Sequence, residues 1–467
     1  MAMGKRKQRQ ESLFITAQRL PKSDGHPFYK QLNRLLAEAA FDRWIERRCE
    51  RYYEREEKRG QPSIPPGVYF RMLLVGYFEG IDSQRGIAWR CADSLSLRQF
   101  LGIPLEENTP DHSTLTNTRQ RLPEEVFHEV FQFVLAIAAK KKLLSGKTVA
   151  VDSTTLEANA AMKSIIRRDT GDDWNEYVTA LMVEEGVIDE DEQPTDEEIR
   201  RFDKSRKNKR VSNDEWVNPN DPDARITKMK DGRTHLAYKT EHVVDLDSDL
   251  VLAAEVRHAD EGDTETMVDS VMQARVNLQA AGSDANIEEA AADKGYHAAH
   301  TIELADDLGL RTYIPEPELK YDRRWTDKPE EFKRAVYNNR RRMGRAKGKR
   351  LQRRRSELCE RTFAHVCETG GMRRTWLRGR VDVAKRYLIA VAAHNLGRIL
   401  RSLFGIGKPK TLQRNGEDGD LLLLLYFIIA RLRTALAPLS ARLEVLRAPK
   451  GIQQPNNAPS HPPTIAA

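Results

Sequence analysis

The stretch Gly146-Lys-Thr-Val-Ala-Val-Asp152-Ser-Thr-Thr decides the fold that we expect for this chain. An apolar run, Val149 to Val151, ends on a carboxylate that small hydroxyl residues follow. Because β-branched residues favour strands, the run predicts a buried strand with Asp152 at its end. An acid in that place can hold a divalent metal ion. It can equally cap the following turn through Ser153 or Thr154.

Two further acids extend this pattern. Asp293 follows the short apolar run Ile287-Glu-Glu-Ala-Ala-Ala292, and Glu360 follows a dense basic segment. Carboxylates from separate segments that converge on two metal ions are the basis of two-metal phosphoryl transfer. Magnesium prefers such oxygen ligands. The three acids therefore predict a metal-dependent site that acts on phosphates.

The charges of the chain are segregated along the sequence. Its 467 residues allow two or three domains, and the net charge is +7. Twelve Lys or Arg and no acid lie between Lys333 and Arg355, whereas nine acids and no Lys or Arg lie between Glu184 and Glu198. The first segment indicates a polyanionic partner such as DNA, and the second indicates a solvated or regulatory face.

Cysteine usage and hydropathy indicate the cellular compartment and exclude some kinds of site. The four cysteines contain no CxxC pair, which argues against a structural zinc site and a disulfide framework. The basic N-terminus lacks the apolar core of a secretory signal. The longest apolar run, Leu421 to Ala430, is too short to span a bilayer. We expect a cytoplasmic protein with no membrane partner.

The periodicity of apolar residues divides the chain into regions. Helical spacing dominates the N-terminal third, and strand-like runs that alternate with helical ones predict an α/β domain with a mixed sheet. We expect the following regions: a basic arm at 1–20, a helical domain at 21–142 that binds DNA ends or serves packing alone, an α/β domain at 143–405 with a polar insertion at about 158–233, and a C-terminal helix with a disordered proline-rich tail at 406–467.

Three blocks of this sequence resemble those of bacterial insertion-sequence DDE transposases. They are Gly146-Lys-Thr-Val-Ala-Val-Asp152-Ser-Thr, Ala292-Asp-Lys-Gly-Tyr296 and Glu360-Arg-Thr-Phe-Ala-His365. Pro110 to Leu122 resembles the end of the family's helical N-terminal domain, and the segments after Glu360, up to Gly397, are similar as well. The resemblance covers roughly residues 12 to 405 and rests on the order of the blocks.

The resemblance implies an RNase H-like catalytic domain with a mixed sheet, preceded by the all-helical domain. It implies that Asp152, Asp293 and Glu360 are the catalytic acids and hold two Mg2+ ions, for which Mn2+ can substitute. The implied activity is cleavage of the element's ends and joining of the 3′-hydroxyls to target DNA. The implied partners are double-stranded DNA, as terminal inverted repeats and as target, and further copies of the chain in a homodimer or larger assembly in the bacterial nucleoid.

The third acid is the one that departs from the family signature. Ser356 and Cys367 stand where related groups have Arg and Lys, so Glu357 and Glu368 remain alternatives. Glu360 is preferred because Glu-Arg-Thr-Phe fits the family's Glu-x-x-Phe spacing.

Basic and aromatic residues around the acids are candidates for DNA contacts. For the basic run the alternative is a solvated helix, and for Tyr296 it is packing against the sheet. The candidates are Arg340, Arg341, Arg342, Arg353, Arg354, Arg355, Arg373, Arg374, Lys294 and Tyr296.

Two other functions remain open from the sequence. One is a catalytically inactive DNA-binding derivative of a transposase, which keeps the basic surface and has lost the chemistry. The other is a metal-dependent DNA nuclease that hydrolyses but does not join strands.

Overall fold

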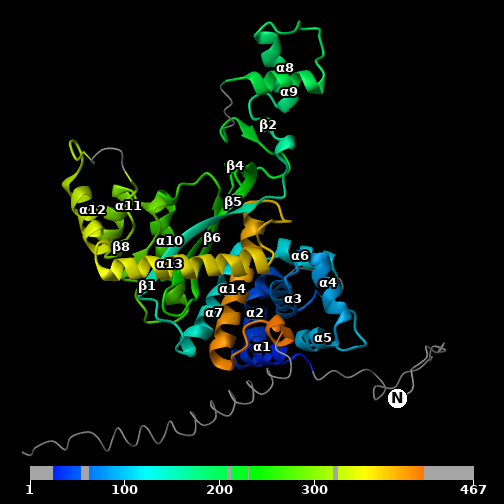
Figure 1. Ribbon diagram of the computed structural model, residues 1–467. Helices are drawn as coiled ribbons and strands as arrows, with labels where there is room; N and C mark the ends of the chain where they lie inside the picture. Colours follow the sequence, from blue (N-terminus) through cyan, green and yellow to red (C-terminus); the bar gives the residue numbers. More distant parts are fainter. Residues whose placement is uncertain (1–24, 54–62, 208–211, 230, 319–323, 415–467) are drawn as a thin grey trace, which may run out of the picture. The chain divides into compact units, whose positions relative to one another are not determined.

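A computed structural model describes residues 25–53, 63–207, 212–229, 231–318 and 324–414 (Figure 1). The described residues up to Thr411 form one compact unit. The expected basic arm and nearly all of the expected C-terminal region lie outside the described residues. No helix in the described ranges is long and apolar enough to cross a membrane.

The N-terminal region is helical, as its periodicity predicts. Serine and aspartate side chains accept hydrogen bonds from backbone N–H groups at the starts of α4, α5 and α6, which satisfies donors that a helix leaves unpaired. The helices are α1 (Pro27–Glu38), α2 (Phe41–Cys49), α3 (Pro66–Glu79), α4 (Gln84–Asp93), α5 (Leu95–Leu101), α6 (His112–Arg121) and α7 (Glu124–Lys140).

The sheet combines antiparallel and parallel pairing. Its strands are β1 (Thr148–Glu157), β4 (Arg225–Lys228), β5 (Thr234–Asp245), β6 (Val251–His258), β7 (Glu289–Ala291) and β8 (Arg311–Tyr313). The order is β4-β5-β1-β7-β8, and β6 pairs with the same edge of β5 as β4 does. β5 pairs antiparallel with β1 and β6, whereas β7 is parallel to both β1 and β8. The sheet is therefore mixed, as expected.

The predicted end of the first strand is wrong. β1 continues past Asp152 to Glu157, because β5 pairs with it along that whole length. The parallel partner β7 pairs with β1 only over residues 148–150. Asp152 thus lies in the middle of its strand, yet just beyond the end of the parallel pairing.

Helices cover both faces of the sheet. α10 (Asp263–Ala280) packs on β5 and β6 from one side, followed by α11 (Ala299–Asp307). On the other side α13 (Ala346–Phe363), which follows α12 (Glu330–Met343), crosses β1, β5, β7 and β8 (Figure 1). Neighbouring side chains of a strand point to opposite faces. Consequently Asp152 contacts α13, whereas Ser153 contacts α10.

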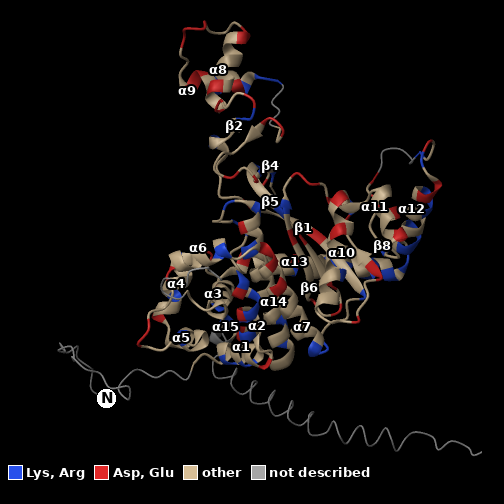
Figure 2. Cartoon of the chain, turned by 180° about the vertical axis from the view of Figure 1, so that it is seen from behind, with Lys and Arg blue, Asp and Glu red and all other residues tan. Residues whose placement is uncertain are grey.

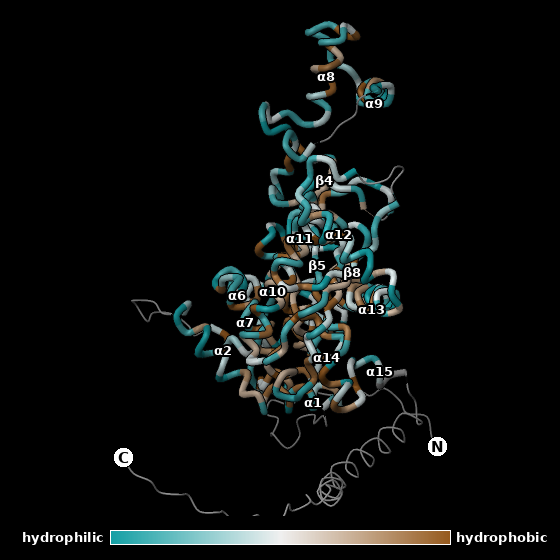
Figure 3. The backbone as a smooth tube through the Cα atoms, turned by 90° about the vertical axis from the view of Figure 1, so that its left-hand side faces the viewer, coloured by the Kyte–Doolittle hydropathy of each residue, from teal (hydrophilic) through white to brown (hydrophobic). Residues whose placement is uncertain are grey.

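α14 (Arg380–Phe404) is buried on every side along most of its length. It packs against α3 and α7 on one side and against β6 on the other. Hydrophobic segments concentrate around it (Figure 3). The helical region and the sheet therefore share this helix as a common core element.

The polar segment between β1 and β5 contains a small core of its own. α8 (Trp174–Glu184) and α9 (Asp196–Ser205) pack around Val178, Met182 and Ile199. The two-stranded pair β2 (Ile166–Arg167) and β3 (Trp216–Val217) lies at its base. Acidic residues colour much of α9 but little of α8 (Figure 2).

Candidate active site

The parallel register of β1 and β7 brings Asp152 and Asp293 to the same end of the sheet. Ala150 is paired with Ala291, and each aspartate lies two residues beyond its alanine. The Asp293 side chain accepts a hydrogen bond from the backbone N–H of Gly295 at 2.8 Å, which holds the carboxylate in a tight turn after β7. Two acids that are far apart in the sequence thus become neighbours.

α13 places an arginine directly against the first acid. Nη1 of Arg355 lies 2.9 Å from Oδ2 of Asp152, and both side chains are largely buried. The other oxygen of Asp152 accepts from the backbone N–H of Ser153 at 2.9 Å. One turn before Arg355, Gln352 donates to the backbone oxygen of Ala292 at 3.0 Å, which fixes α13 across the end of β7.

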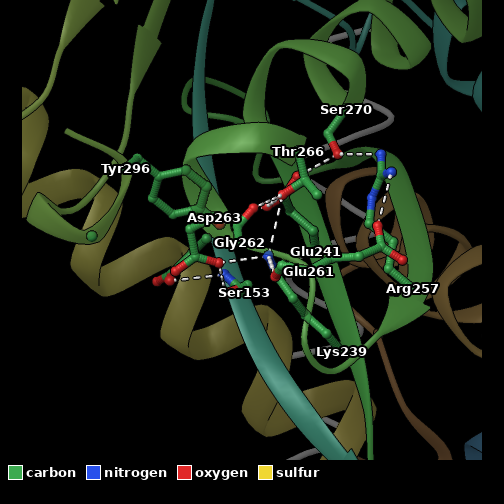
Figure 4. A network of polar contacts seen from close by, with 12 residues as sticks. Ser153, Lys239, Glu241, Arg257, Glu261, Gly262, Asp263, Thr266, Ser270 and Tyr296 are labelled. Atoms are coloured by element: carbon green, nitrogen blue, oxygen red, sulfur yellow. Dashed lines mark hydrogen bonds and ion pairs between the residues drawn. The ribbon is translucent and has the colours of Figure 1, made fainter. Parts of the chain in front are cut away.

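A second set of polar residues lies on the opposite face of β1 and β5 (Figure 4). Asp263, in the first turn of α10, accepts from the Ser153 hydroxyl at 3.0 Å and pairs with the ammonium of Lys239 at 2.7 Å. Lys239 is buried, so its charge depends on this partner. Neither residue is among the site residues predicted from the sequence. The signal that could have found Lys239 is the charged pair Lys239 and Glu241, two positions apart and therefore on one face of the strand.

The carboxylate of Asp263 lies near that of Asp293 at Gly295. A Cβ atom at position 295 would lie 3.0 Å from Oδ1 of Asp293 and 3.3 Å from Oδ2 of Asp263. The two carboxylates therefore approach the same point in space, which only a glycine leaves open. Carboxylate oxygens converging in this way are the donors that Mg2+ prefers, so Asp293 and its surroundings fit a divalent ion.

Glu360 does not join the two aspartates in this arrangement. Its side chain is exposed on α13 and accepts from the Ser356 hydroxyl at 2.9 Å. Its neighbour in the sequence, Cys359, lies close to Asp152: burial raises the pKa of the Cys359 thiol most, and the charge of Asp152 raises it further. Among the described residues, no three His, Cys, Asp or Glu side chains could together hold a metal ion.

The two alternative third acids are engaged elsewhere. Glu357 forms an ion pair with Arg361, which also contacts Asp249. Glu368 lies in the wide helical turn η5 (Ala364–Thr369) and pairs with Arg373 at 2.8 Å. Both carboxylates are exposed.

The basic residues named from the sequence divide into two groups. Arg341, Arg353 and Lys294 are exposed and have no ion pair with another described residue. The others are held by the protein: Arg340 by Glu316, Arg342 by the backbone oxygen of Thr312, Arg354 by Asp247, Arg355 by Asp152, Arg373 by Glu368 and Thr154, and Arg374 by Glu157 with its guanidinium over the ring of Trp376.

Tyr296 lies inside the fold rather than on its surface. Its ring is fully buried, and its hydroxyl donates to Glu241 at 2.8 Å. Glu241 is itself buried and also accepts from Thr266 and Ser270 of α10 (Figure 4). Of the two roles considered for Tyr296, the structure supports packing. The expected DNA contact is wrong, because the side chain is fully buried.

His242 is buried in the interior, next to Asp152. The two residues are paired across β1 and β5, and the imidazole contacts the hydroxyls of Thr362 and Tyr387 at 3.0 and 2.8 Å. Burial lowers the pKa of His242 to about 3, so the ring is neutral near pH 7. It serves as a hydrogen-bonded spacer between the sheet and the helices α13 and α14.

Comparisons with known proteins identify two segments. Residues 16–121 match the family model of a transposase domain (DUF772), and residues 318–400 match that of a transposase DDE domain. The first covers α1 to α6, and the second covers α12 to α14 with Arg355 and Glu360. No curated protein and no solved structure matches the chain.

Proposed function

For this chain, which belongs to the insertion-sequence DDE transposases, we propose that Asp152, Asp293 and Glu360 form the metal-binding centre that cleaves and joins DNA. The substrate is the double-stranded DNA of the element's ends, and the acceptor is target DNA. The observation that carries this proposal is the register of β1 and β7, which brings Asp152 and Asp293 to the same end of neighbouring strands, where Arg355 of α13 contacts Asp152.

The topology of the sheet supports an RNase H-like catalytic domain. β6, β5 and β1 form an antiparallel set, and β7 and β8 continue the sheet on the other side of β1 in parallel. The first acid then lies on the first strand, the second follows the fourth strand of this set, and the third lies on a helix that crosses the sheet.

All three acids would serve as metal ligands in the proposed reaction. When bound, two Mg2+ ions would activate the attacking water or 3′-hydroxyl and stabilise the leaving oxygen. Asp152 and Asp293 supply oxygen ligands from fixed backbone, whereas Glu360 must turn inward from the exposed side of α13. Exposed cations such as Arg341, Arg353 and Lys294 hold the DNA backbone, which makes binding weaker as salt rises.

Charge-neutral substitution of the two aspartates tests the proposal. Asp152→Asn and Asp293→Asn should each lower cleavage of a duplex with the terminal inverted repeats by at least about 10²–10³-fold, the cost of losing one electrostatic group from an active site. Binding of the same duplex in a gel-shift assay should persist, because the basic surface is unchanged. Asp284→Asn, an exposed carboxylate after α10, is the matched control. Full cleavage by either variant would refute the proposed centre.

Three glutamine substitutions identify the third acid. Glu360→Gln should abolish Mg2+-dependent cleavage, whereas Glu357→Gln and Glu368→Gln should leave most of it, because those two carboxylates pair with Arg361 and Arg373. Loss of activity in either of the latter variants alone would transfer the role from Glu360 to that residue.

The inactive derivative is a second candidate, and two observations favour it. Glu360 is turned outward, and Asp152 is already held by Arg355. An inactive protein would bind the terminal repeats but would not cut them at any Mg2+ concentration. A strand-transfer assay on the wild-type protein separates a transposase from a nuclease that only hydrolyses.

A further inference from the structure

The ion pair between Asp152 and Arg355 places a fixed positive charge on the first acid of the site. Nη1 and Oδ2 are 2.9 Å apart, and the two side chains are only 14% and 19% exposed. Charges withdrawn from water in this way interact more strongly than a surface pair. Removal of one partner leaves the other uncompensated. Asp152 is therefore occupied by a cation that belongs to the protein.

The helix that carries Arg355 is anchored on both sides of it. One turn earlier, Gln352 donates to the backbone oxygens of Ala292 and Tyr313 at 3.0 and 2.5 Å. One turn later, Cys359 is completely buried against the sheet. The direction of the Arg355 side chain toward Asp152 is thus set by the packing of α13 and is not a chance surface contact.

The guanidinium of Arg355 is only partly satisfied by Asp152. Its Nε is buried and has no hydrogen-bond partner within the described part of the chain. Guanidinium has five N–H donors in a planar fork, and a phosphate can take two of them in parallel. A DNA phosphate would therefore offer Arg355 more acceptors than Asp152 does. Arg353, exposed on the same helix, would help to bring it there.

A divalent ion and Arg355 compete for the same carboxylate. Oδ2 of Asp152 pairs with Arg355, and Oδ1 accepts from the N–H of Ser153. A metal ion on Asp152 would stand close to the guanidinium, and the two cations would repel each other. Metal binding is therefore favoured when Arg355 has left.

We propose that Arg355 couples DNA binding to metal binding: it holds Asp152 until a DNA phosphate takes its guanidinium, which frees the carboxylate for Mg2+. This inference rests on the proposed function, because it assumes that Asp152 is a metal ligand. Arg355 acts through Asp152 and is a positioning residue. By reciprocity, a metal ion on Asp152 must strengthen DNA binding by the same factor.

Titration of the full-length protein with Mn2+ tests the coupling without measuring catalysis. Electron paramagnetic resonance counts bound Mn2+ in the presence and absence of a duplex that carries the terminal inverted repeat. DNA should tighten Mn2+ binding to the wild type by about tenfold, a typical coupling between two sites. Arg355→Gln should bind Mn2+ without DNA as tightly as the wild type does with DNA, and DNA should add nothing further.

Two variants keep the test specific. Arg200→Gln removes the same charge from an exposed position on α9, outside the basic segment, and should retain the DNA-dependent gain. Arg355→Lys keeps a charge without the fork and should show an intermediate gain, and it serves if Arg355→Gln does not fold. An unchanged Mn2+ affinity in Arg355→Gln, or a wild-type affinity that DNA does not alter, overturns the coupling.

Asp152→Asn separates this inference from the function on which it rests. Titrated with DNA, that variant also gives the background of Mn2+ bound by the duplex itself. If it loses the protein's Mn2+ site while the coupling is absent in the wild type, the metal centre stands and the role of Arg355 is refuted. If Mn2+ binding is unaffected by Asp152→Asn, the proposed function and the coupling both fail.

Discussion

At the scale of single residues, the site depends on what is absent at position 295. Gly295 has no side chain, and the carboxylates of Asp293 and Asp263 both reach the space that a Cβ atom would take. Lys239 and Ser153 hold Asp263 from the other side. Asp263 therefore lies against the second acid of the proposed centre without being part of the family signature.

Gly295→Ala should weaken metal binding without unfolding the protein. The added Cβ would lie 3.0 Å from Asp293 and 3.3 Å from Asp263, so one carboxylate must shift by a few tenths of an ångström. We expect Mn2+ affinity to fall roughly tenfold, as for changes that displace a metal ligand. The free energy of unfolding should change by less than about 1 kcal/mol, because residue 295 is exposed.

Gly344→Ala is the control for that prediction. Its Cβ would meet only backbone oxygens at ordinary contact distance, with Arg340 the nearest at 3.6 Å. Unaltered Mn2+ affinity in Gly295→Ala would show that the carboxylate of Asp293, which lies nearest to the added Cβ, is not a metal ligand.

At the scale of elements, β5 contains an unusual number of buried polar side chains. Lys239 and Glu241 point to α10, whereas His242 points to α13 and α14. Each is hydrogen-bonded, which is the condition for burying such groups without a large cost. β5 thus joins the helices on the two faces of the sheet through polar contacts as well as apolar packing.

Stability should fall in acid because His242 is buried in its neutral form. Burial lowers its pKa to about 3 in the folded state, below the ordinary value of 6.5. The unfolded chain therefore binds the extra proton first, and stability present above pH 6.5 is lost progressively as the pH falls toward 3. At pH 5 the loss from this residue is about 2 kcal/mol.

Urea unfolding at pH 7 and pH 5 measures this loss. His242→Gln, which does not titrate, should lose about 2 kcal/mol less than the wild type between the two pH values. His300→Gln replaces an exposed histidine and should behave as the wild type does. An identical pH dependence in the wild type and His242→Gln would contradict a neutral, buried His242.

The insertion should be removable as an element. Its helices pack on their own core, and the N–H of Arg168 donates to the oxygen of Glu215 at 2.8 Å beside the β2–β3 pair. Replacement of residues 169–214 by an Asn-Gly turn should therefore close the gap. Trp216→Thr is needed as well, because Trp216 packs on Trp174 and Tyr177.

The free energy of unfolding of the shortened protein should lie within about 1 kcal/mol of that of the full chain, because a surface loop contributes mainly closure entropy. Chemical denaturation followed by circular dichroism measures it. A shortened protein that aggregates or melts early would show that the insertion supports the sheet.

Local patterns predict most of these elements, and long-range contacts decide the rest. The expected alternation of strand-like and helical runs is found in β5, β6 and α10, because the periodicity of each is contained in its own segment. The continuation of β1 to Glu157 depends on β5, which is distant in sequence. The pairing of Asp152 with Arg355 likewise arises only when α13 crosses the sheet. The aspartates could be named in advance, but their partners could not.

At the scale of the whole molecule, α14 ties the helical region to the sheet. Nε of Arg119, on α6, lies 3.1 Å from Asp382, and Arg386 donates to the backbone oxygens of Leu73 and Ile81. Arg119 and Arg386 are buried, so these contacts cannot be exchanged for water while the fold is intact. The two regions should behave as one cooperative unit.

Asp382→Asn should destabilise both regions together. It leaves the buried charge of Arg119 without its ion-pair partner, at a cost of about 2 kcal/mol for a hydrogen bond to a charged group. Hydrogen exchange should show α3 and β6 losing protection to the same extent. Glu197→Gln breaks the exposed pair with Arg201 and should cost less than about 0.5 kcal/mol. Loss of protection confined to the helices would show that the regions unfold separately.

The late position of α14 in the chain delays completion of the N-terminal core during synthesis. About 240 residues separate the end of α7 from the start of α14, so the ribosome needs roughly 10 to 50 s to reach the helix that completes the N-terminal core. Throughout that interval the apolar sides of α3 and α7 have no permanent cover. We therefore expect chaperones to bind the first helices until α14 has been synthesised. A chain that ends before α14 should not form a stable N-terminal core.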